Sequence, residues 1–352
     1  MKKSLIALAA LAASGFAMAQ SSVTLFGVVD TGVTYVDGAQ NWSGLTSGNN
    51  STSRLGFRGT EDLGGGLKAN FWLEAGLNAD NGDGAGGKEN GKTDSGLEFK
   101  RRSTIGLEGG FGEVRLGREL TAAYNAVSRY DVFGTVGVAQ SRIWGQAGNV
   151  IRGNNLISYY TPNFSGFKAA VNYGFGEQTE NRDGRYFGAS LTYDNGPLSV
   201  GFGGERLNRG GAYHFGTQAA FAAADITAYG IGASYKFGAV KLAAAYRTQE
   251  NKLIGGAATD RDAYLIGLSA PVGAAGEVKV SYNRYETEVA GAADQKTDQL
   301  GLGYVHSLSK RTAVYSTYAY IKNKNGAGIT LGNGGLDNGK QHAIQAGVRH
   351  SF

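Results

Sequence analysis

The chain has 352 residues, including 58 glycines, 3 prolines and no cysteine, with 41% hydrophobic residues, 18% charged residues and a formal net charge of +5 at pH 7. Glycine is far above its usual share of roughly 7%, and charged residues fall below the usual quarter, which excludes an ordinary soluble α/β enzyme. Collagen is excluded by the scarce proline, a disordered chain by the 19 Tyr and 16 Phe, and disulfide scaffolds or thiolate metal sites by the missing cysteine. The modest charge, without a long basic run, gives no reason to expect a nucleic-acid partner.

The N-terminal residues have the pattern of a secretory signal peptide. Lys2 and Lys3 are followed by the apolar stretch Leu5–Ala13 and by the cleavage pattern Ala17–Ala19. We therefore expect residues 1–19 to be removed and residues 20–352 to form the exported domain. No later stretch approaches the roughly 18 consecutive apolar residues of a membrane helix, so a helical membrane protein is excluded.

After the leader, apolar and polar residues alternate in segments of strand length. This two-residue period indicates strands with one oily face and one polar or small face. The clearest segments are Leu67–Ala75, Phe167–Tyr173, Tyr229–Phe237, Val240–Arg247 and Glu277–Asn283. Their oily faces carry Ala, Val and Leu with Tyr and Phe near the ends, which favours a lipid-facing band with aromatic girdles over a soluble sandwich. Ser22–Val36 and Ala263–Ala270 are apolar on both faces, so alternation does not set their orientation.

The connections between these segments alternate in length. The short ones are rich in turn formers: Gly64–Gly66, Gly109–Gly112, Pro162–Gly166, Asn195–Gly196, Phe237–Ala239, Gly273–Gly276 and Leu308–Arg311. The long ones are polar and include Asp37–Ser51, Asp80–Gly96, Asn208–Phe221, Leu253–Asp260 and Asn325–Gly339. Seven short turns and eight long loops separate sixteen strands. We therefore predict an all-β fold, a sixteen-stranded antiparallel transmembrane β-barrel with tight turns at one end and long loops at the other.

A barrel of this size is too wide to be filled by its own side chains, so it should enclose an aqueous channel. The longest connection, Thr121–Ile151, follows the fifth predicted strand and has fewer glycines than the other loops. A segment of this length without strand character is improbable as a passive linker. We expect it to fold back into the lumen.

Five segments, in this order along the chain, resemble the general porins of Gram-negative bacteria, closest to the β-proteobacterial and neisserial branch. They are Val23–Asp30 (VTLFGVVD), Ser53–Gly59 (SRLGFRG), Val114–Arg118 (VRLGR), Tyr159–Gly166 (YYTPNFSG) and Gly347–Phe352 (GVRHSF). The resemblance covers residues 20–352. It implies a homotrimer of sixteen-stranded barrels in the bacterial outer membrane, each narrowed by its third loop and open to small hydrophilic solutes and ions. It also implies contact with outer-membrane lipids, including lipopolysaccharide, and with the barrel assembly machinery.

The family places arginines on the barrel wall at the pore constriction. Arg54, Arg118 and Arg152 fall on positions similar to that cluster. Arg54 and Arg58 also share the polar face of their strand, so alternation alone points both inward. Arg118 has the parity of the apolar residues of its strand, and it needs a bulge or the strand end to turn it inward.

The family also places carboxylates at the constriction. Asp131 resembles the acid of the inward loop, and Glu74 resembles the acidic wall residue of the third strand. Further cations with inward parity are Lys68, Lys168, Lys241, Arg247 and Lys279. With a single convincing loop acid against several arginines, we expect a weak preference for anions.

The C-terminal segment carries a predicted assembly signal. Phe352, Val348, Ala346 and Ile344 share one face, as a lipid-facing last strand read by the assembly machinery requires. The alternative is that the terminal phenylalanine is a chance ending.

Signals for catalysis, cofactors or metals are poor. His214, His306, His342 and His350 are scattered without metal-ligand spacing. Gly82–Gly87 fits G-x-G-x-x-G, but no helix follows it, so a dinucleotide site is not expected. No serine lies in a nucleophile elbow, and Asp80 with Asp83 lacks the ligand ladder of a calcium loop. We expect no enzyme activity, cofactor or metal.

The preferred function is a passive diffusion channel in the outer membrane. A substrate-selective channel for phosphate or organic anions is the alternative within transport, because arginine and lysine rings recognise such ions. An outer-membrane adhesin or barrel enzyme is a weaker alternative, since the long loops look like hydrated spacers and no catalytic constellation is found.

Overall fold

The computed structural model describes residues 22–84, 96–144, 150–177, 182–208, 224–253, 256 and 258–352. The predicted signal peptide lies outside the described residues. The chain forms strands and one short helix, in the order β1 (Ser22–Asp37), β2 (Trp42–Ser47), β3 (Arg54–Gly64), β4 (Leu67–Gly76), β5 (Arg102–Gly109), β6 (Gly112–Leu120), α2 (Ala122–Ser128), β7 (Arg152–Tyr160), β8 (Phe167–Gly174), β9 (Tyr186–Asn195), β10 (Leu198–Leu207), β11 (Ala224–Phe237), β12 (Val240–Leu253), β13 (Ala258–Val272), β14 (Gly276–Thr287), β15 (Gln295–Ser307), β16 (Thr312–Lys324) and β17 (Lys340–Ser351). None of the helices within the described ranges has the length and apolarity needed to cross a membrane.

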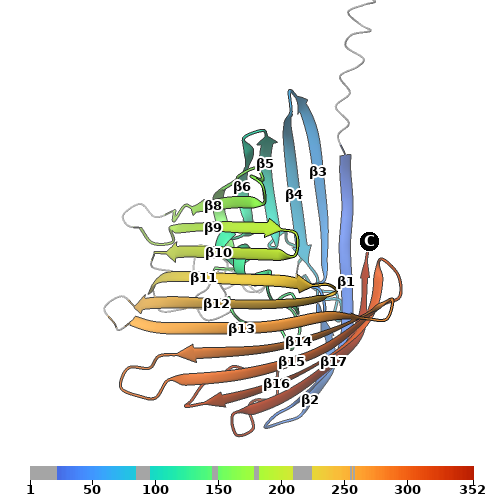
Figure 1. The fold of residues 1–352 in the computed structure, drawn as a ribbon, viewed down its shortest axis with the longest axis vertical. Helices are drawn as coiled ribbons and strands as arrows, with labels where there is room; N and C mark the ends of the chain where they lie inside the picture. The colour runs from blue at the N-terminus through green and yellow to red at the C-terminus, as the bar shows by residue number, and fades with distance from the viewer. Residues whose placement is uncertain are drawn as a thin grey trace, which may run out of the picture.

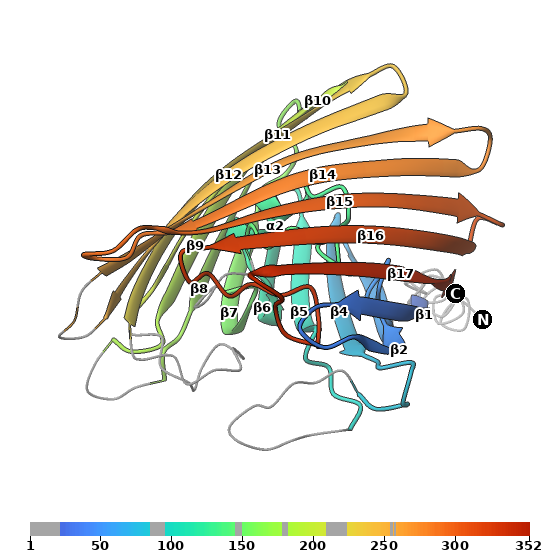
Figure 2. The same cartoon turned by 90° about the horizontal axis from the view of Figure 1, so that it is seen from below.

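The strands close into a single antiparallel barrel. From β3 onward each strand pairs with the next, and β1 pairs with β17 from Val28↔Ser351 to Asp37↔His342. Figures 1 and 2 show the strands curving round until the C-terminus lies beside β1. The other edge of β1 pairs with β3 over Ser22–Val28 and with β2 over Thr31–Val36. Strands β2 and β3 pair with successive parts of the same edge of β1, so together they occupy one position in the wall. The strands β1 to β17 therefore fill the sixteen predicted positions.

Strand β2 lies inside the segment predicted as a long loop, Asp37–Ser51. Its six residues contain only two bulky apolar side chains, Trp42 and Leu45, so the sequence shows little alternation there. Backbone pairing with β1, rather than a hydrophobic face, accounts for this strand.

The oily face of the strands is the exposed face, as the alternation predicts. In β11, Tyr229, Ile231 and Tyr235 are exposed, whereas Ala228 and Ser234 on the other parity are buried. The sheet is closed, so the exposed apolar band lies outside and the small or polar residues lie inside, the arrangement of a barrel in lipid. The seven short turns all fall at the predicted places; in the first, Gly64, Gly65 and Gly66 have φ of +84°, +62° and +82°, which favour glycine.

The structure also sets the orientation of β13, one of the two strands that alternation left open. In β13, Tyr264 and Ile266 are exposed, whereas Ala263 and Leu265 are buried. Both buried residues belong to a hydrophobic cluster with Val127, Ile143 and other residues of the 121–151 segment. The inward face of β13 is therefore apolar because that segment covers it.

The 121–151 segment starts as α2 and packs against wall residues that do not face lipid. Thr121 caps the helix, and its Oγ1 and N donate to the carbonyls of Val150 and Ile151 at 3.0 Å each, which joins the two ends of the segment. Helix α2 lies beside β9 and β10. Further along, the backbone N of Val138 donates to Gln345 Oε1 of β17 at 2.8 Å.

Glycines on the barrel wall leave the space in which this segment packs. A Cβ on Gly203 of β10 would lie 2.6 Å from the Ala123 carbonyl oxygen, and a Cβ on Gly232 of β11 would lie 2.1 Å from the Tyr130 ring. On β15, a Cβ on Gly303 would lie 2.7 Å from the Phe133 ring. These glycines let the backbone of the wall touch the segment directly, so part of the high glycine content has a packing reason.

Candidate functional site

Two arginines share one glutamate at the start of β3. Arg54 Nε lies 3.9 Å from Oε1 of Glu74 on β4. Nε of Arg101, just before β5, donates to the same oxygen at 2.6 Å. The other carboxylate oxygen of Glu74 accepts from Trp72 Nε1 at 3.1 Å. Because one carboxylate balances only one of two guanidinium groups, the cluster keeps a positive charge.

Arg152 and Arg118 extend the cluster along β6 and β7. Arg152 Nε donates to the backbone carbonyl of Arg101 at 3.0 Å, so it joins the Arg54–Glu74–Arg101 group. The pairing of β6 with β7 shifts register between Gly117 and Glu119, which is the kind of bulge that Arg118 requires. Arg118 donates to the Lys100 carbonyl and to Asn154 Oδ1, and thus lies among polar atoms rather than in the apolar band.

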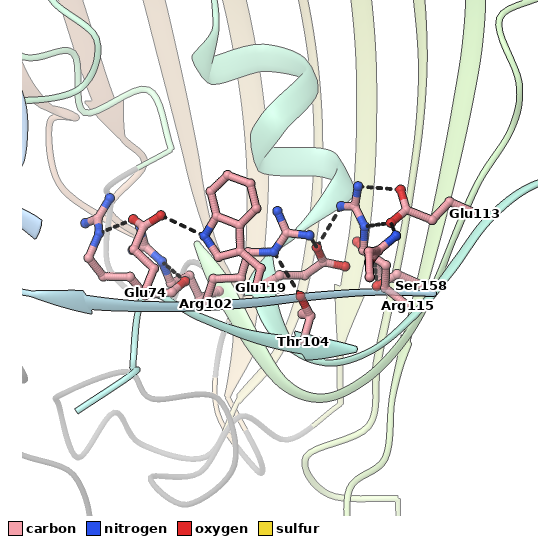
Figure 3. A network of polar contacts seen from close by, with 12 residues as sticks. Glu74, Arg102, Thr104, Glu113, Arg115, Glu119 and Ser158 are labelled. Atoms are coloured by element: carbon pink, nitrogen blue, oxygen red, sulfur yellow. Dashed lines mark hydrogen bonds and ion pairs between the residues drawn. The ribbon is translucent and has the colours of Figure 1, made fainter. Parts of the chain in front are cut away.

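A second group of ion pairs lies closer to the short turns. Arg102 is stacked on Trp72, with its guanidinium carbon 4.6 Å from the ring centroid, and its Nη2 is 3.9 Å from Glu119 Oε2. Arg115 donates to Glu119 at 3.0 Å and to both oxygens of Glu113 at 2.7 and 2.6 Å. Figure 3 shows these side chains in a row between Glu74 and Glu113.

We call the residues of these two groups, together with Arg58, the arginine wall. Its members are Arg54, Arg58, Arg101, Arg102, Arg115, Arg118, Arg152, Glu74, Glu113 and Glu119. Seven guanidinium groups thus stand beside three carboxylates, on β3 to β7 and the residue before β5. The 121–151 segment packs on other strands, chiefly β9 to β17, so the two features occupy different parts of the circumference.

The predicted pore role of Asp131 needs correction. Its carboxylate is only 5% exposed and accepts the backbone N–H groups of Phe133, Thr135 and Ser141 at 2.9, 2.8 and 2.8 Å. Burial raises the pKa of Asp131 above its usual range, and the three N–H groups oppose that shift. Asp131 therefore fastens the 121–151 segment internally instead of presenting a charge to solutes.

Sequence reasoning missed Arg101, Arg102 and Arg115. Arg115 lies between Val114 and Leu116, so the alternation that sends those two outward already marked it as inward. Arg101 and Arg102 stand at a boundary between loop and strand, where no preceding alternation fixes the parity. The signal available there was the basic run Lys100-Arg101-Arg102 leading into a strand.

Arg247 of β12 also faces inward, but it is part of the packing under the 121–151 segment. It is fully buried, 4.3 Å from the ring of Trp144, and its Nη2 lies 3.8 Å from Glu205 Oε1. The other oxygen of Glu205 accepts from the Tyr186 hydroxyl at 2.9 Å. This polar cluster supports Trp144, so Arg247 holds the segment rather than lining the channel.

Phe352 completes the seam between the first and last strands. Its backbone N and O each form a hydrogen bond of 3.1 Å with Gly27 of β1. Its side chain is exposed together with Val348 and Ile344, so the expected common face of the last strand is present.

A closed sixteen-position barrel with an apolar outside and a charged inside defines a transmembrane β-barrel channel. Residues 5–326 match the Gram-negative porin family, and the chain belongs to it. It is 46% identical over the full length of both chains to outer membrane porin protein 32 of Delftia acidovorans. Together these findings identify an outer-membrane porin, a channel protein rather than an enzyme.

Two solved structures show the same architecture. The anion-selective porin from Comamonas acidovorans is 44% identical, with a TM-score of 0.82 over 95% of this chain and 100% of that chain. OmpT of Vibrio cholerae, described in a trimer form, has a TM-score of 0.70 over 94% of this chain and 99% of that chain; at 18% identity it shows the fold alone.

Proposed function

We propose that this porin is a passive diffusion channel for small hydrophilic solutes and ions with a weak preference for anions. The observation that carries the proposal is the Arg54–Glu74–Arg101–Arg152 group, where Arg54 and Arg101 share one carboxylate and Arg152 donates to the backbone carbonyl of Arg101. We take this group to lie at the constriction, with the 121–151 segment narrowing the lumen from its own side. Support for that position is that the segment starts beside this group, since the backbone N of Thr121 donates at 3.0 Å to the carbonyl of Ile151, the residue before Arg152.

The charge imbalance is large enough to affect permeation. Two unit charges 4 Å apart interact by about 1 kcal/mol in bulk water and about 4 kcal/mol at an effective dielectric constant of 20. A few uncompensated guanidinium groups in a narrow aqueous passage can therefore favour anions several-fold, although the whole chain is only slightly positive. The similar Comamonas acidovorans porin is described as anion-selective, which agrees with this proposal.

The test is the zero-current potential of the purified channel in a planar bilayer under a tenfold KCl gradient. We expect a sign that reports chloride preference in the wild type and a shift toward potassium in Arg54→Glu and Arg152→Glu. Lys310→Glu, on an exposed short turn, is the matched control and should move the potential little. Potassium preference in the wild type would refute the proposal.

The same arginines also support a second candidate function, a channel selective for phosphate or organic anions. The two candidates differ in how conductance depends on solute concentration. A diffusion channel conducts in proportion to phosphate concentration, whereas a selective channel saturates at low concentration.

We also infer a homotrimer that contacts lipopolysaccharide and is inserted by the barrel assembly machinery. The support is family membership, together with the exposed apolar band that must meet lipid or a neighbouring barrel. Chemical cross-linking in intact outer membranes should give a ladder that ends at three times the mass of the chain.

A further inference from the structure

The guanidinium group of Arg58 is held by two aromatic rings on the inner wall. Its carbon lies 5.3 Å from the Phe26 centroid and 5.2 Å from the Trp72 centroid, and the two rings meet edge to face at 5.0 Å. Arg58 is exposed, and among the described residues no carboxylate forms an ion pair with it. Its orientation is thus fixed by aromatic contacts while its charge remains open to a solute.

A second guanidinium group lies close by. Arg102 contacts the same Trp72 at 4.6 Å, so the guanidinium carbons of Arg58 and Arg102 are no more than about 10 Å apart. Both line a hollow of about 340 Å³, together with Thr24, Asn70, Arg115 and the carboxylates of Glu108 and Glu113. Glu113 is paired with Arg115 at 2.6 Å, so the charges of these two side chains offset each other. This hollow can hold a small organic ion.

The hollow adjoins the constriction group through Trp72, whose Nε1 donates to Glu74 at 3.1 Å. Arg58 lies four residues beyond Arg54 along β3, toward the short turn at Gly64–Gly66, which corresponds to about 13 Å of strand. In porin barrels the short turns face the periplasm. A solute that passes Arg54 would therefore meet the Arg58 hollow afterwards.

The chemistry of the hollow suits a particular class of anion. Guanidinium is planar and weakly hydrated, it binds a carboxylate through paired N–H groups, and it stacks on aromatic faces. An aromatic carboxylate offers both the anion and a ring that can pack beside Arg58, Phe26 and Trp72. A short aliphatic carboxylate has the same charge but lacks the ring.

We propose that Phe26, Arg58, Trp72 and Arg102 form a second anion-binding station in the pore, which favours aromatic carboxylates over aliphatic ones. The inference rests on the proposed anion-conducting function and names a solute class for it. The station slows such ions in transit and so gives a saturable component to their permeation.

The experiment compares benzoate with acetate as blockers of chloride current through the purified trimer in a planar bilayer. The half-blocking concentration of each ion is measured at constant chloride. For the wild type we expect benzoate to block at a concentration about threefold to tenfold lower than acetate, the effect expected of one cation–π or stacking contact. Equal half-blocking concentrations would overturn the proposal.

Three variants locate the effect. Arg58→Lys keeps the charge but removes the planar group, and Phe26→Leu removes one ring without touching Glu74; both should bring the benzoate-to-acetate ratio close to one. Lys68→Gln removes an inward charge from the strand that carries Trp72 and should leave the ratio unchanged. A wild-type ratio in Arg58→Lys would contradict the proposal.

The zero-current potential in KCl, measured on the same channels, keeps the two proposals apart. Loss of chloride preference with a retained benzoate effect refutes only the proposed selectivity. Chloride preference without a benzoate effect refutes only the binding station.

Discussion

At the scale of single residues, the same chemical group has opposite roles on the two sides of the channel. Glu74 accepts from side chains of the arginine wall and partly neutralises it. Asp131 accepts backbone N–H groups of its own segment and is shielded from water. Sequence position alone does not separate these two carboxylates, since both fall where the family places acids.

This difference predicts the behaviour of Asp131→Asn. The amide cannot accept all three N–H groups, and each unsatisfied buried donor costs about 1–3 kcal/mol. We expect faster proteolysis within residues 121–151 and little change in the zero-current potential. Asp80→Asn removes the same charge from an exposed loop position and is the control. A larger shift toward anions in Asp131→Asn than in Asp80→Asn would restore the pore role of Asp131.

At the scale of elements, glycines on the barrel wall allow the 121–151 segment to pack directly against the wall backbone. Gly232 has no space for a side chain, because a Cβ would lie 2.1 Å from Tyr130. Gly232→Val should push the segment off β11 toward the lumen, at a cost of about 1–3 kcal/mol from overpacking. The expected result is a lower single-channel conductance with preserved β-sheet circular dichroism. Gly328→Ala, at a position with open space, should conduct like the wild type.

A second element-scale prediction concerns the seam between β1 and β17. Deleting Phe352 removes both hydrogen bonds to Gly27 and an apolar ring from the outer face. We expect less folded protein in the outer membrane, with export across the inner membrane intact, as measured by fractionation. Phe164→Ala removes another exposed ring from a turn and should leave the level unchanged. Normal outer-membrane amounts after the deletion would show that Phe352 is not an assembly signal.

The barrel itself could be predicted because its two governing signals are local. Alternation fixed which face of β11 and β12 meets lipid, and glycine-rich turns marked the strand ends. Contacts between distant segments could not be predicted in this way. Nothing near Ala263 or Leu265 in the chain shows that residues 121–151 will cover them, and nothing near Arg101 shows that Glu74 will be its partner.

At the scale of the whole molecule, the anion preference is a sum over many charges at different depths. Exposed charges are screened over about 10 Å at 0.1 M salt and over about 3 Å at 1 M. Arg58 is exposed, whereas Arg54 and Arg101 are half-buried in the group around Glu74 and are screened less.

This arrangement predicts a graded dependence on salt. The chloride-to-potassium permeability ratio should fall between a 0.01 to 0.1 M gradient and a 0.1 to 1 M gradient, because the exposed charges stop acting at a distance. It should stay above one at the higher range, because ions at the constriction pass within a few ångströms of Arg54, Arg101 and Arg152. Arg54→Gln should lower the chloride-to-potassium permeability ratio more in the 0.1 to 1 M gradient than in the 0.01 to 0.1 M gradient. A ratio that does not depend on salt would mean that size exclusion, rather than this charge distribution, controls permeation.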